Sequence, residues 1–200
     1  MSCWALVPVK ARGTAKQRLA TVLDATARST LMHAMVQHVL EVLGQCAVIE
    51  RIAVVTPDRE RLPESVHWLA DAGREVNREL RAALDSLAAL GVSRIALVSA
   101  DLPLLAAGEV GALVAASAAG KIALAPDRHG TGTNALALSL PIAFQPQFGP
   151  DSLVRHVAEA AKLGVEAVLV ERPGLAFDVD EPEDLTILRA RGDPRFALPP

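Results

Sequence analysis

Short apolar runs alternate along this chain with longer segments of helical periodicity. Several of the runs, such as residues 122–125, are apolar throughout, which is typical of strands buried on both faces of a sheet. The longer segments, such as residues 25–43, repeat apolar side chains every three or four positions, which is typical of helices with one buried face. The pattern predicts strands over residues 4–9, 49–56, 94–99, 122–125, 134–140, 165–170 and 176–179, and helices over residues 25–43, 75–90, 109–118, 153–163 and 182–191.

The order of these elements predicts an α/β fold in a single domain of residues 1–200. Strands that alternate with helices favour a three-layer sandwich with a mostly parallel sheet. Gly44, Gly91 and Gly164 follow three of the predicted helices and supply C-terminal stops, and Asp151 or Ser152 can cap the helix that follows them. Ligands of such sheets bind beyond the carboxyl ends of the strands, so residues that follow strands are the first candidates for a site.

Composition and charge exclude several kinds of partner. Apolar residues make up 51% of the 200 residues, which is enough for a core, and the net charge of −3 argues against a broad nucleic-acid surface. No uncharged stretch is long enough to cross a bilayer, and Pro8 and Lys10 interrupt the pattern of a signal peptide. Cys3 and Cys46 form no spaced framework, as expected of reduced thiols. We therefore expect a cytoplasmic protein without nucleic-acid or membrane partners.

Four basic side chains follow the first predicted strand within nine residues, with no acid among them: Lys10, Arg12, Lys16 and Arg18. Like charges this close repel each other, so a protein core would not gather them, whereas a phosphate chain would. A solvated basic turn is the alternative. The chain has neither a Gly-x-x-x-x-Gly-Lys-Ser/Thr nor a Gly-x-Gly-x-x-Gly motif, so side-chain cations would have to bind such phosphates.

Three aspartates lie near the ends of other predicted strands. Asp101 comes just after residues 94–99, and Asp178 and Asp180 are two apart, which in an extended chain places both on the same side. At about 7 Å and an effective dielectric of about 20, the pair repels by about 2 kcal/mol, which a shared cation would relieve. Carboxylates from two strand ends suit Mg²⁺, which completes its coordination with phosphate oxygens and water. Turn capping and helix capping are the alternative roles for these aspartates.

Two stretches of small residues are suited to bind an anion through backbone N–H groups. Gly130-Thr-Gly-Thr133-Asn134 leads into a predicted strand, and Phe148-Gly149-Pro-Asp-Ser152 opens a predicted helix. A plain connection and a plain helix cap are the alternatives. The histidines lack metal-ligand spacing and neither cysteine has an activating neighbour, so the sequence indicates no side-chain nucleophile.

Cations at one strand end, acids at others and an anion-binding loop are the components of phosphoryl or nucleotidyl transfer, which depends on positioning and charge neutralisation. Five blocks in order carry a family resemblance: Val7-Pro-Val-Lys10 with Ala15-Lys-Gln-Arg-Leu19; Ser99-Ala-Asp-Leu-Pro103; Gly132-Thr-Asn-Ala-Leu136; Phe148-Gly-Pro-Asp-Ser152 with His156; and Ala176-Phe-Asp-Val-Asp180 with Pro182-Glu-Asp-Leu185. From Trp4 to about Leu188 the chain resembles the 2-phospho-L-lactate guanylyltransferase family of deazaflavin coenzyme F-420 biosynthesis.

The resemblance implies a Rossmann-like nucleotidyltransferase fold of the glycosyltransferase-A type, with GTP and Mg²⁺ as reagents. It implies that Lys10, Lys16, Arg18 and Asn77 bind GTP, that Asp101, Asp178 and Asp180 bind Mg²⁺, and that Thr133, Asn134, Gly149 and Ser152 bind the acceptor. Lys16, Arg18 and Asp101 would be the catalytic side chains. The surroundings of Asn77 depart from the family pattern, because the charged stretch Arg74-Glu-Val76 precedes it.

The implied acceptor is a small phosphorylated three-carbon acid: phosphoenolpyruvate, 3-phosphoglycerate or 2-phospholactate. The sequence does not choose among the three. GMP would join the acceptor's phosphate and pyrophosphate would leave. The expected partners are therefore small-molecule substrates, with a homodimer as a further possibility. Two rival functions stay open: another nucleotidyltransferase, acting on molybdopterin or a sugar phosphate, and a nucleotide-binding regulator without chemistry. The first rival usually opens on a Gly-rich loop, which residues 7–10 lack.

Overall fold

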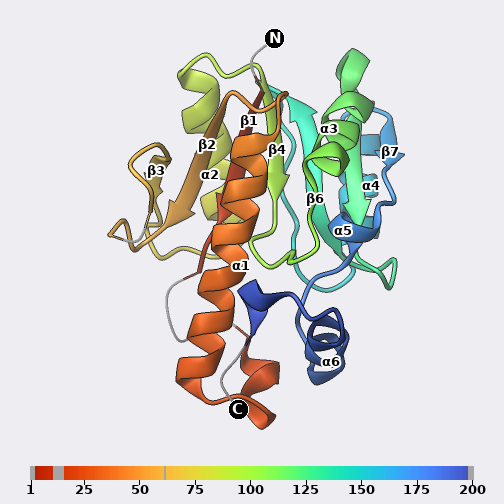
Figure 1. Ribbon diagram of the computed structural model, residues 1–200. Coiled ribbons are helices and arrows are strands. Elements are labelled where there is room, and N and C mark those ends of the chain that lie inside the picture. The colour runs from red at the N-terminus through yellow and green to blue at the C-terminus, as the bar shows by residue number, and fades with distance from the viewer. Residues whose placement is uncertain (1–2, 11–15, 61, 198–200) are drawn as a thin grey trace.

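A seven-stranded mixed sheet forms the centre of the molecule (Figure 1). The computed structural model describes residues 3–10, 16–60 and 62–197. Within them the strands are β1 (Cys3–Pro8), β2 (Arg51–Thr56), β3 (His67–Ala70), β4 (Arg94–Val98), β5 (Ile122–Pro126), β6 (Thr133–Ser139) and β7 (Ala167–Leu169). Their order across the sheet is β3-β2-β1-β4-β6-β5-β7, and β6 runs antiparallel to both of its neighbours while the other pairs are parallel. The predicted α/β fold with a mostly parallel sheet is confirmed.

Helices cover both faces of this sheet (Figure 1). They are α1 (Ala25–Gln45), α2 (Val76–Ala89), α3 (Ala107–Ala116), α4 (Ser152–Lys162), α5 (Pro173–Ala176) and α6 (Pro182–Ala190), with 3-10 turns η1 (Gln17–Thr21), η2 (Ala118–Gly120) and η3 (Pro194–Phe196). The buried clusters assign α1, α3 and α5 to one face and α2 and α4 to the other. Across the described part of the chain, none of these helices is long and apolar enough to cross a membrane.

The reversed direction of β6 brings its beginning to the edge of the sheet where β1 and β4 end. Val98, at the end of β4, pairs with Ala135 near the start of β6. Just beyond this pair, the Ser99 N–H donates to the Asn134 carbonyl at 2.9 Å. Residues that follow β1 and β4 therefore meet residues that open β6, and this edge is where ligands of such sheets bind.

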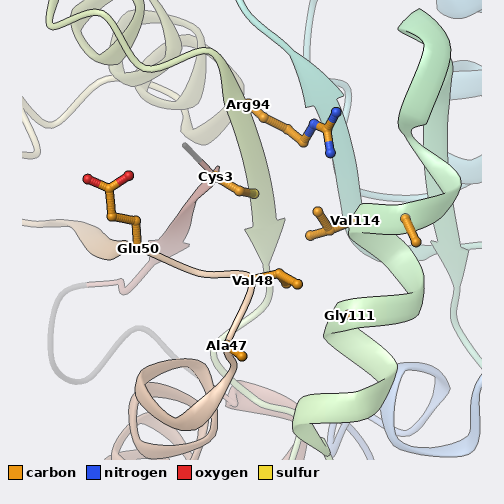
Figure 2. Close-up of a pocket in the computed structure, with 8 residues that line it drawn as sticks. Cys3, Ala47, Val48, Glu50, Arg94, Gly111 and Val114 are labelled. Carbon is orange, nitrogen blue, oxygen red and sulfur yellow. The ribbon is translucent and has the colours of Figure 1, made fainter. Parts of the chain in front are cut away.

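The opposite edge, where β1 and β4 begin, carries a cavity of about 620 Å³ beside α3 (Figure 2). Glu50 and Arg94 are the charged residues of its wall, which also includes Cys3, Val48 and Val114. Burial raises the pKa of the Cys3 thiol to about 11, so the thiol stays protonated and is a poor nucleophile. This cavity contains none of the residues that the sequence predicts for the site.

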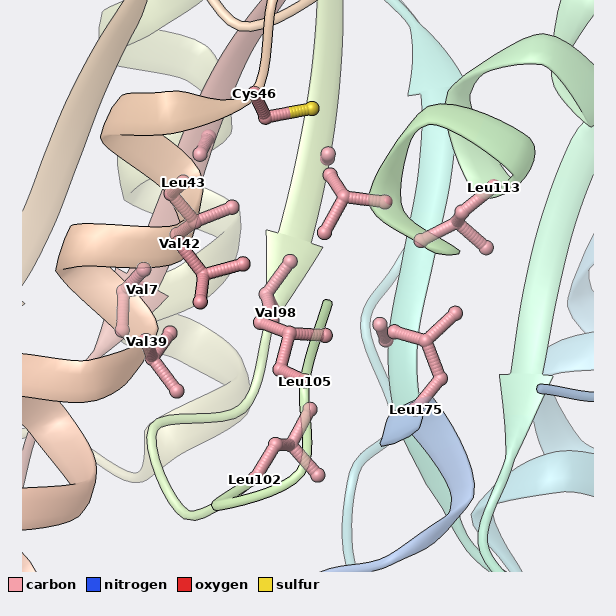
Figure 3. Packing of buried hydrophobic residues seen from close by; sticks show 14 of the residues in the cluster. Val7, Val39, Val42, Leu43, Cys46, Val98, Leu102, Leu105, Leu113 and Leu175 are labelled. Atoms are coloured by element: carbon pink, nitrogen blue, oxygen red, sulfur yellow. The ribbon is translucent and has the colours of Figure 1, made fainter. Parts of the chain in front are cut away.

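The central strands are buried on both faces, as their apolar sequences predict. In β1, Val7 packs with Val39 and Leu43 of α1 (Figure 3), whereas its neighbour Leu6 belongs to the cluster on the other face, with Leu84 of α2. Successive strand residues point to opposite sides of a sheet, so a strand covered on both sides needs apolar side chains at every position. The apolar runs in the sequence therefore correspond to strands that are buried on both faces.

A third buried cluster lies beyond the edge of the sheet and joins the two ends of the described chain. Leu19 of η1 packs with Leu31 and Met35 of α1 and with Leu185 and Leu188 of α6. Burying an apolar side chain of this size contributes about 1.5–3 kcal/mol to stability. The cluster therefore holds the predicted basic segment beside the segment that follows the paired aspartates.

The structure corrects several local predictions. Residues 177–180 have no regular structure, so the predicted strand over residues 176–179 is wrong, and α5 instead ends at residue 176. Helix α1 continues past Gly44 to Gln45, where there is open space around the glycine. Strand β3 is not predicted, because it has only four residues, of which Trp68-Leu69-Ala70 are apolar, and its side chains are partly or fully exposed.

The start of α4 is capped by a neighbouring loop. Asp151 has a left-handed backbone, with φ of 54°, and its side chain makes no capping hydrogen bond. The predicted side-chain cap by Asp151 is therefore absent. Instead, the N–H of Ser152 donates to the carbonyl of Gly149 and the N–H of Leu153 to that of Thr131, both at 3.1 Å. Backbone carbonyls thus satisfy N–H groups that a helix start leaves free, and they attach the loop before β6 to α4.

His156 of α4 fixes the surroundings of this helix start. Its side chain is fully buried, and its Nε2 accepts a hydrogen bond from the Gln147 N–H at 2.9 Å. The proton of the neutral ring therefore lies on Nδ1, which donates to Thr133 Oγ1 at 3.0 Å. The rings of Phe144 and Phe148 lie 5.6 and 4.8 Å from the imidazole centroid. Burial, then the nearby charge of Arg155, lowers the pKa of His156 to about 4.

We expect His156 to make folding stability depend on pH between about 4 and 6.5, its pKa values in the folded and unfolded chain. In that window the unfolded chain binds a proton that the folded protein does not, so stability is complete above about pH 6.5 and falls as the pH drops. The loss amounts to about 3 kcal/mol at pH 4. Urea unfolding at pH 7 and pH 4.5 should show a smaller loss for His156→Gln than for the wild type.

The exposed His33 provides a matched control, because His33→Gln should keep the wild-type pH dependence. Identical pH dependence in His156→Gln and wild type would contradict a buried imidazole that stays neutral.

Candidate active site

A cavity of about 550 Å³ lies at the sheet edge where β1 and β4 end and β6 begins. Ten of the predicted site residues line it: Lys10, Lys16, Arg18, Asp101, Thr133, Asn134, Gly149, Ser152, Asp178 and Asp180. Its size is that of a site for small molecules. The eleventh predicted residue, Asn77, is not among the residues that line it, and Arg12, which the sequence places in the basic loop, lies outside the described residues.

Lys16 is the central charge of this cavity. Its ammonium forms ion pairs with Asp101 and with Asp180, whose Oδ1 lies 2.6 Å from Nζ. The lysine side chain is only 5% exposed. Burial by itself lowers the pKa of Lys16, but the two carboxylates outweigh it and raise the pKa well above its usual value, so the side chain stays charged.

The backbone of Lys16 is also unusual. Its φ of 58° lies in the left-handed region, which side chains other than glycine seldom adopt. Such a conformation costs on the order of 1–3 kcal/mol and persists where the surrounding contacts hold it. Here the two ion pairs provide those contacts. They hold the strained backbone in the conformation that places the ammonium against Asp101 and Asp180.

Asp178 completes a group of three carboxylates around one ammonium. Burial raises the pKa of Asp178 to about 6, and the negative charges of Asp101 and Asp180 act in the same direction. Burial also opposes ionisation of Asp180, yet the charge and hydrogen bond of Lys16 leave the pKa of Asp180 lowered. The group carries more negative charge than Lys16 balances, and its oxygen ligands are of the kind that a hard divalent cation prefers.

In the described residues no group of three Asp, Glu, His or Cys side chains is arranged as a ready-made metal site. Asp101 and Asp180 are instead paired with the Lys16 ammonium. The three carboxylates fit a divalent cation by the chemistry of their oxygen ligands, and Lys16 is the counter-ion of two of them.

Asn134 supports the acidic segment. Its Nδ2 donates to the carbonyls of Leu175 and Ala176, at 3.0 and 3.2 Å, and reaches Asp178 Oδ1 at 3.3 Å. An amide NH₂ has two hydrogens, so these contacts use its donor capacity. The geometry therefore gives Asn134 a supporting role, and the donor expected for the acceptor acid is already engaged.

The wall opposite the carboxylates is formed by the start of α4 and the loop before it. Gly149 has φ of 119°, a conformation that glycine adopts without strain, and Ser152 is buried at the first turn of the helix. Thr133 reaches the same wall, with its hydroxyl held by His156. The N–H groups of Ser152 and Leu153 are bonded to backbone carbonyls, so the attraction for an anion here comes from the partial positive charge of the helix start.

Asn77 secures this wall from outside the cavity. Its Oδ1 accepts from the Phe148 N–H at 2.7 Å, and its Nδ2 donates to the Phe148 carbonyl at 3.1 Å and to Glu75 Oε1 at 3.0 Å. Both the oxygen and the nitrogen of this amide thus bond to protein groups, and they fix the residue directly before Gly149. The nucleotide contact of Asn77 stays a prediction.

Arg18 lies at the mouth of the cavity. Its side chain is 72% exposed and its Nη1 lies 3.2 Å from Glu181 Oε1. An ion pair this exposed contributes little to stability, so the guanidinium is free to exchange its partner for an anion.

Two residues that sequence reasoning missed support the acidic segment. Arg128 forms an ion pair with Asp184, which is almost wholly buried in the first turn of α6. The motif Pro182-Glu-Asp-Leu185 contained the signal for Asp184, because an acid at this position can bond the backbone N–H groups that precede a helix. No sequence pattern connects it to Arg128, whose position depends on the fold.

Comparison with known proteins identifies the family of this chain. The family model described as "Guanylyl transferase CofC like" matches residues 3–197. A phosphoenolpyruvate guanylyltransferase of Sphaerobacter thermophilus is 41% identical over 189 residues, covering 92% of this chain and 91% of the relative. A 2-phospho-L-lactate guanylyltransferase of Methanopyrus kandleri is 36% identical over 180 residues, covering 90% and 87%.

Solved structures show the same fold. A candidate nucleotide-diphospho-sugar transferase from Desulfovibrio desulfuricans aligns with a TM-score of 0.76 at 19% identity, covering 97% of this chain and 89% of that one. A nucleotidyl transferase from Methanothermobacter aligns with a TM-score of 0.65 at 15% identity, covering 95% and 97%. The predicted nucleotidyltransferase fold is confirmed, and with the match along nearly the whole sequence the chain belongs to the CofC-like family of guanylyl transferases.

Proposed function

We propose that this guanylyltransferase joins GMP from GTP to the phosphate of phosphoenolpyruvate, or of a closely related phosphorylated three-carbon acid, in deazaflavin coenzyme biosynthesis. The observation that carries the proposal is the placement of Lys16 between Asp101 and Asp180, opposite the anion-binding start of α4, in one cavity. Phosphoenolpyruvate comes first among the acceptors because the bacterial relative from Sphaerobacter carries that name. 2-Phospholactate and 3-phosphoglycerate share its carboxylate and phosphate and are the alternatives.

The reaction requires no protein nucleophile. A phosphate oxygen of the acceptor attacks the α-phosphorus of GTP, and a new P–O bond forms. The bond from the α-phosphorus to the bridging oxygen breaks, and its electron pair leaves with pyrophosphate. The attacking phosphate is already an anion near neutral pH, so no base has to remove a proton. Catalysis then consists of positioning and charge neutralisation, which agrees with a neutral, structural His156.

The residues of the cavity divide between these tasks. Asp101, Asp178 and Asp180 would hold Mg²⁺, which when bound supplies neutralisation of the triphosphate charge. Lys10, Lys16 and Arg18 would bind the phosphates and the leaving pyrophosphate. The first turn of α4 and Thr133 would receive the acceptor's carboxylate. Val76, Leu80 and Phe148 give the cavity an apolar side suited to a purine ring.

We expect pyrophosphate release with GTP, Mg²⁺ and phosphoenolpyruvate, and slower release with 2-phospholactate and 3-phosphoglycerate. The Asp101→Asn variant should lose about 10²–10³-fold in kcat/KM, because one charge of the cation site is gone while the shape is kept. Asp85→Asn, on the outer face of α2, should retain wild-type rates. GTP binding without release from any acceptor would contradict the proposal and favour a regulatory nucleotide-binding protein.

Replacing Lys16 separates its two roles. In Lys16→Met the carboxylates lose their counter-ion, so the nucleotide-free protein should bind Mn²⁺ about tenfold more tightly than the wild type, because a positive charge beside the cation is removed. Turnover should nevertheless fall, since the phosphates lose a cation. Mn²⁺ titration followed by electron paramagnetic resonance measures the first effect.

Lys162→Met, in an ion pair on the outer part of α4, is the matched control and should leave Mn²⁺ affinity unchanged. Equal or weaker Mn²⁺ binding by Lys16→Met would show that Lys16 does not occupy the place of the cation.

A further inference from the structure

The acidic segment that carries Asp178 and Asp180 has no regular structure of its own. Residues 177–180 belong to neither helix nor strand, so their backbone groups depend on partners elsewhere. The N–H groups of Asp180 and Glu181 both donate to Asp184 Oδ2, at 2.8 Å each. A single buried carboxylate therefore fixes the backbone at and after one of the proposed cation ligands.

Arg128 contacts this segment at both ends. Its guanidinium forms the ion pair with Asp184, and its Cζ lies 5.5 Å from the centroid of the Phe177 ring. Its backbone N–H donates to the Ala176 carbonyl at 2.9 Å. The residues that precede Asp178 and the carboxylate that follows Asp180 are thus tied to one side chain and one peptide group.

The loop that carries Arg128 also forms part of the cavity wall. Asp127, Thr131 and Gly132 line the cavity, and Asp127 Oδ1 accepts from the Thr131 N–H at 2.9 Å. A Cβ at position 132 would lie 2.8 Å from Asp127 Oδ2, so any larger residue there would displace this carboxylate. Through the Thr131 carbonyl the loop is bonded to the start of α4.

Arg128 itself is not among the residues that line the cavity, and a quarter of its side chain is exposed. Its contacts join the acidic segment to the loop that is bonded to α4.

We propose that Arg128 is a positioning residue, which aligns Asp178 and Asp180 with the acceptor wall through Asp184. The meaning of that alignment for catalysis rests on the proposed function. Without Arg128 the Asp184 carboxylate would be buried without its counter-charge, which is strongly unfavourable. The turn around it would open, and the N–H groups of Asp180 and Glu181 would lose their acceptor. Asp178 and Asp180 would then no longer be held in position relative to the acceptor wall.

The test compares Arg128→Met, Arg128→Lys and the control Lys121→Met with the wild type. Lys121 forms a comparable, exposed ion pair with Glu166 at the other end of the sheet. In Arg128→Met, amide hydrogen exchange at Asp180 and Glu181 should accelerate at least tenfold while the central strands keep their protection. Mn²⁺ affinity should fall about fivefold, and kcat should fall more than the KM for GTP rises. Arg128→Lys should change amide exchange, Mn²⁺ affinity and kcat less than Arg128→Met does, and Lys121→Met should change none of the three.

Unchanged exchange at the two amides, or a loss of protection spread evenly over the sheet, would overturn the positioning role. If Arg128→Met does not fold, the double variant Arg128→Met/Asp184→Asn removes the buried charge but keeps an oxygen acceptor. Its two amides should still exchange faster than in the wild type, because the contact of the Arg128 guanidinium with the Phe177 ring is lost. Exchange is measured in the free protein, so its rates alone decide the role of Arg128, whereas a wild type without turnover would refute only the proposed function.

Discussion

The arrangement of the cavity depends on one constraint, which is the repulsion among three neighbouring carboxylates. Asp101, Asp178 and Asp180 meet at one edge of the sheet, where burial and the two neighbouring charges raise the pKa of Asp178 to about 6. A nearby cation offsets this repulsion, and Lys16 supplies one through its ion pairs with Asp101 and Asp180. Much of the surrounding structure serves to keep the ammonium and the acids within reach of each other.

The supports of this arrangement are uncharged or fully paired. A buried cluster joins η1 and α1 to α6, and so places the two charged segments side by side. Asn134 and Asn77 use their amides on backbone groups, and His156 remains neutral between two aromatic rings. The charged support, Arg128 with Asp184, is a pair of opposite charges whose net charge is zero.

The sequence predicted what depends on local pattern and missed what depends on distant pairing. Double burial produces apolar runs, so the central strands and the residues that follow them were identifiable. The half-exposed β3 has only the three apolar residues Trp68-Leu69-Ala70. Asn134 lines the cavity and Asn77 does not, and which groups their amides bond depends on how loops meet in space. The pairing of Lys16 with Asp180 spans 164 positions, and that of Arg128 with Asp184 joins a loop to a helix start, so neither has a sequence signature.

The strand order has a consequence for the way the protein is made on the ribosome. Strand β6 lies between β4 and β5, although β5 is synthesised before it, so the middle of the sheet must wait for β6 to enter. When the chain has emerged from the ribosome as far as Leu169, the seven strands of the described residues are outside, while Asp178 and Asp180 have not yet emerged. A nascent chain at that stage can form its sheet but holds an ammonium group with only one of its two acidic partners. Assembly of the sheet and assembly of the site are therefore separate events, and the site is the later one.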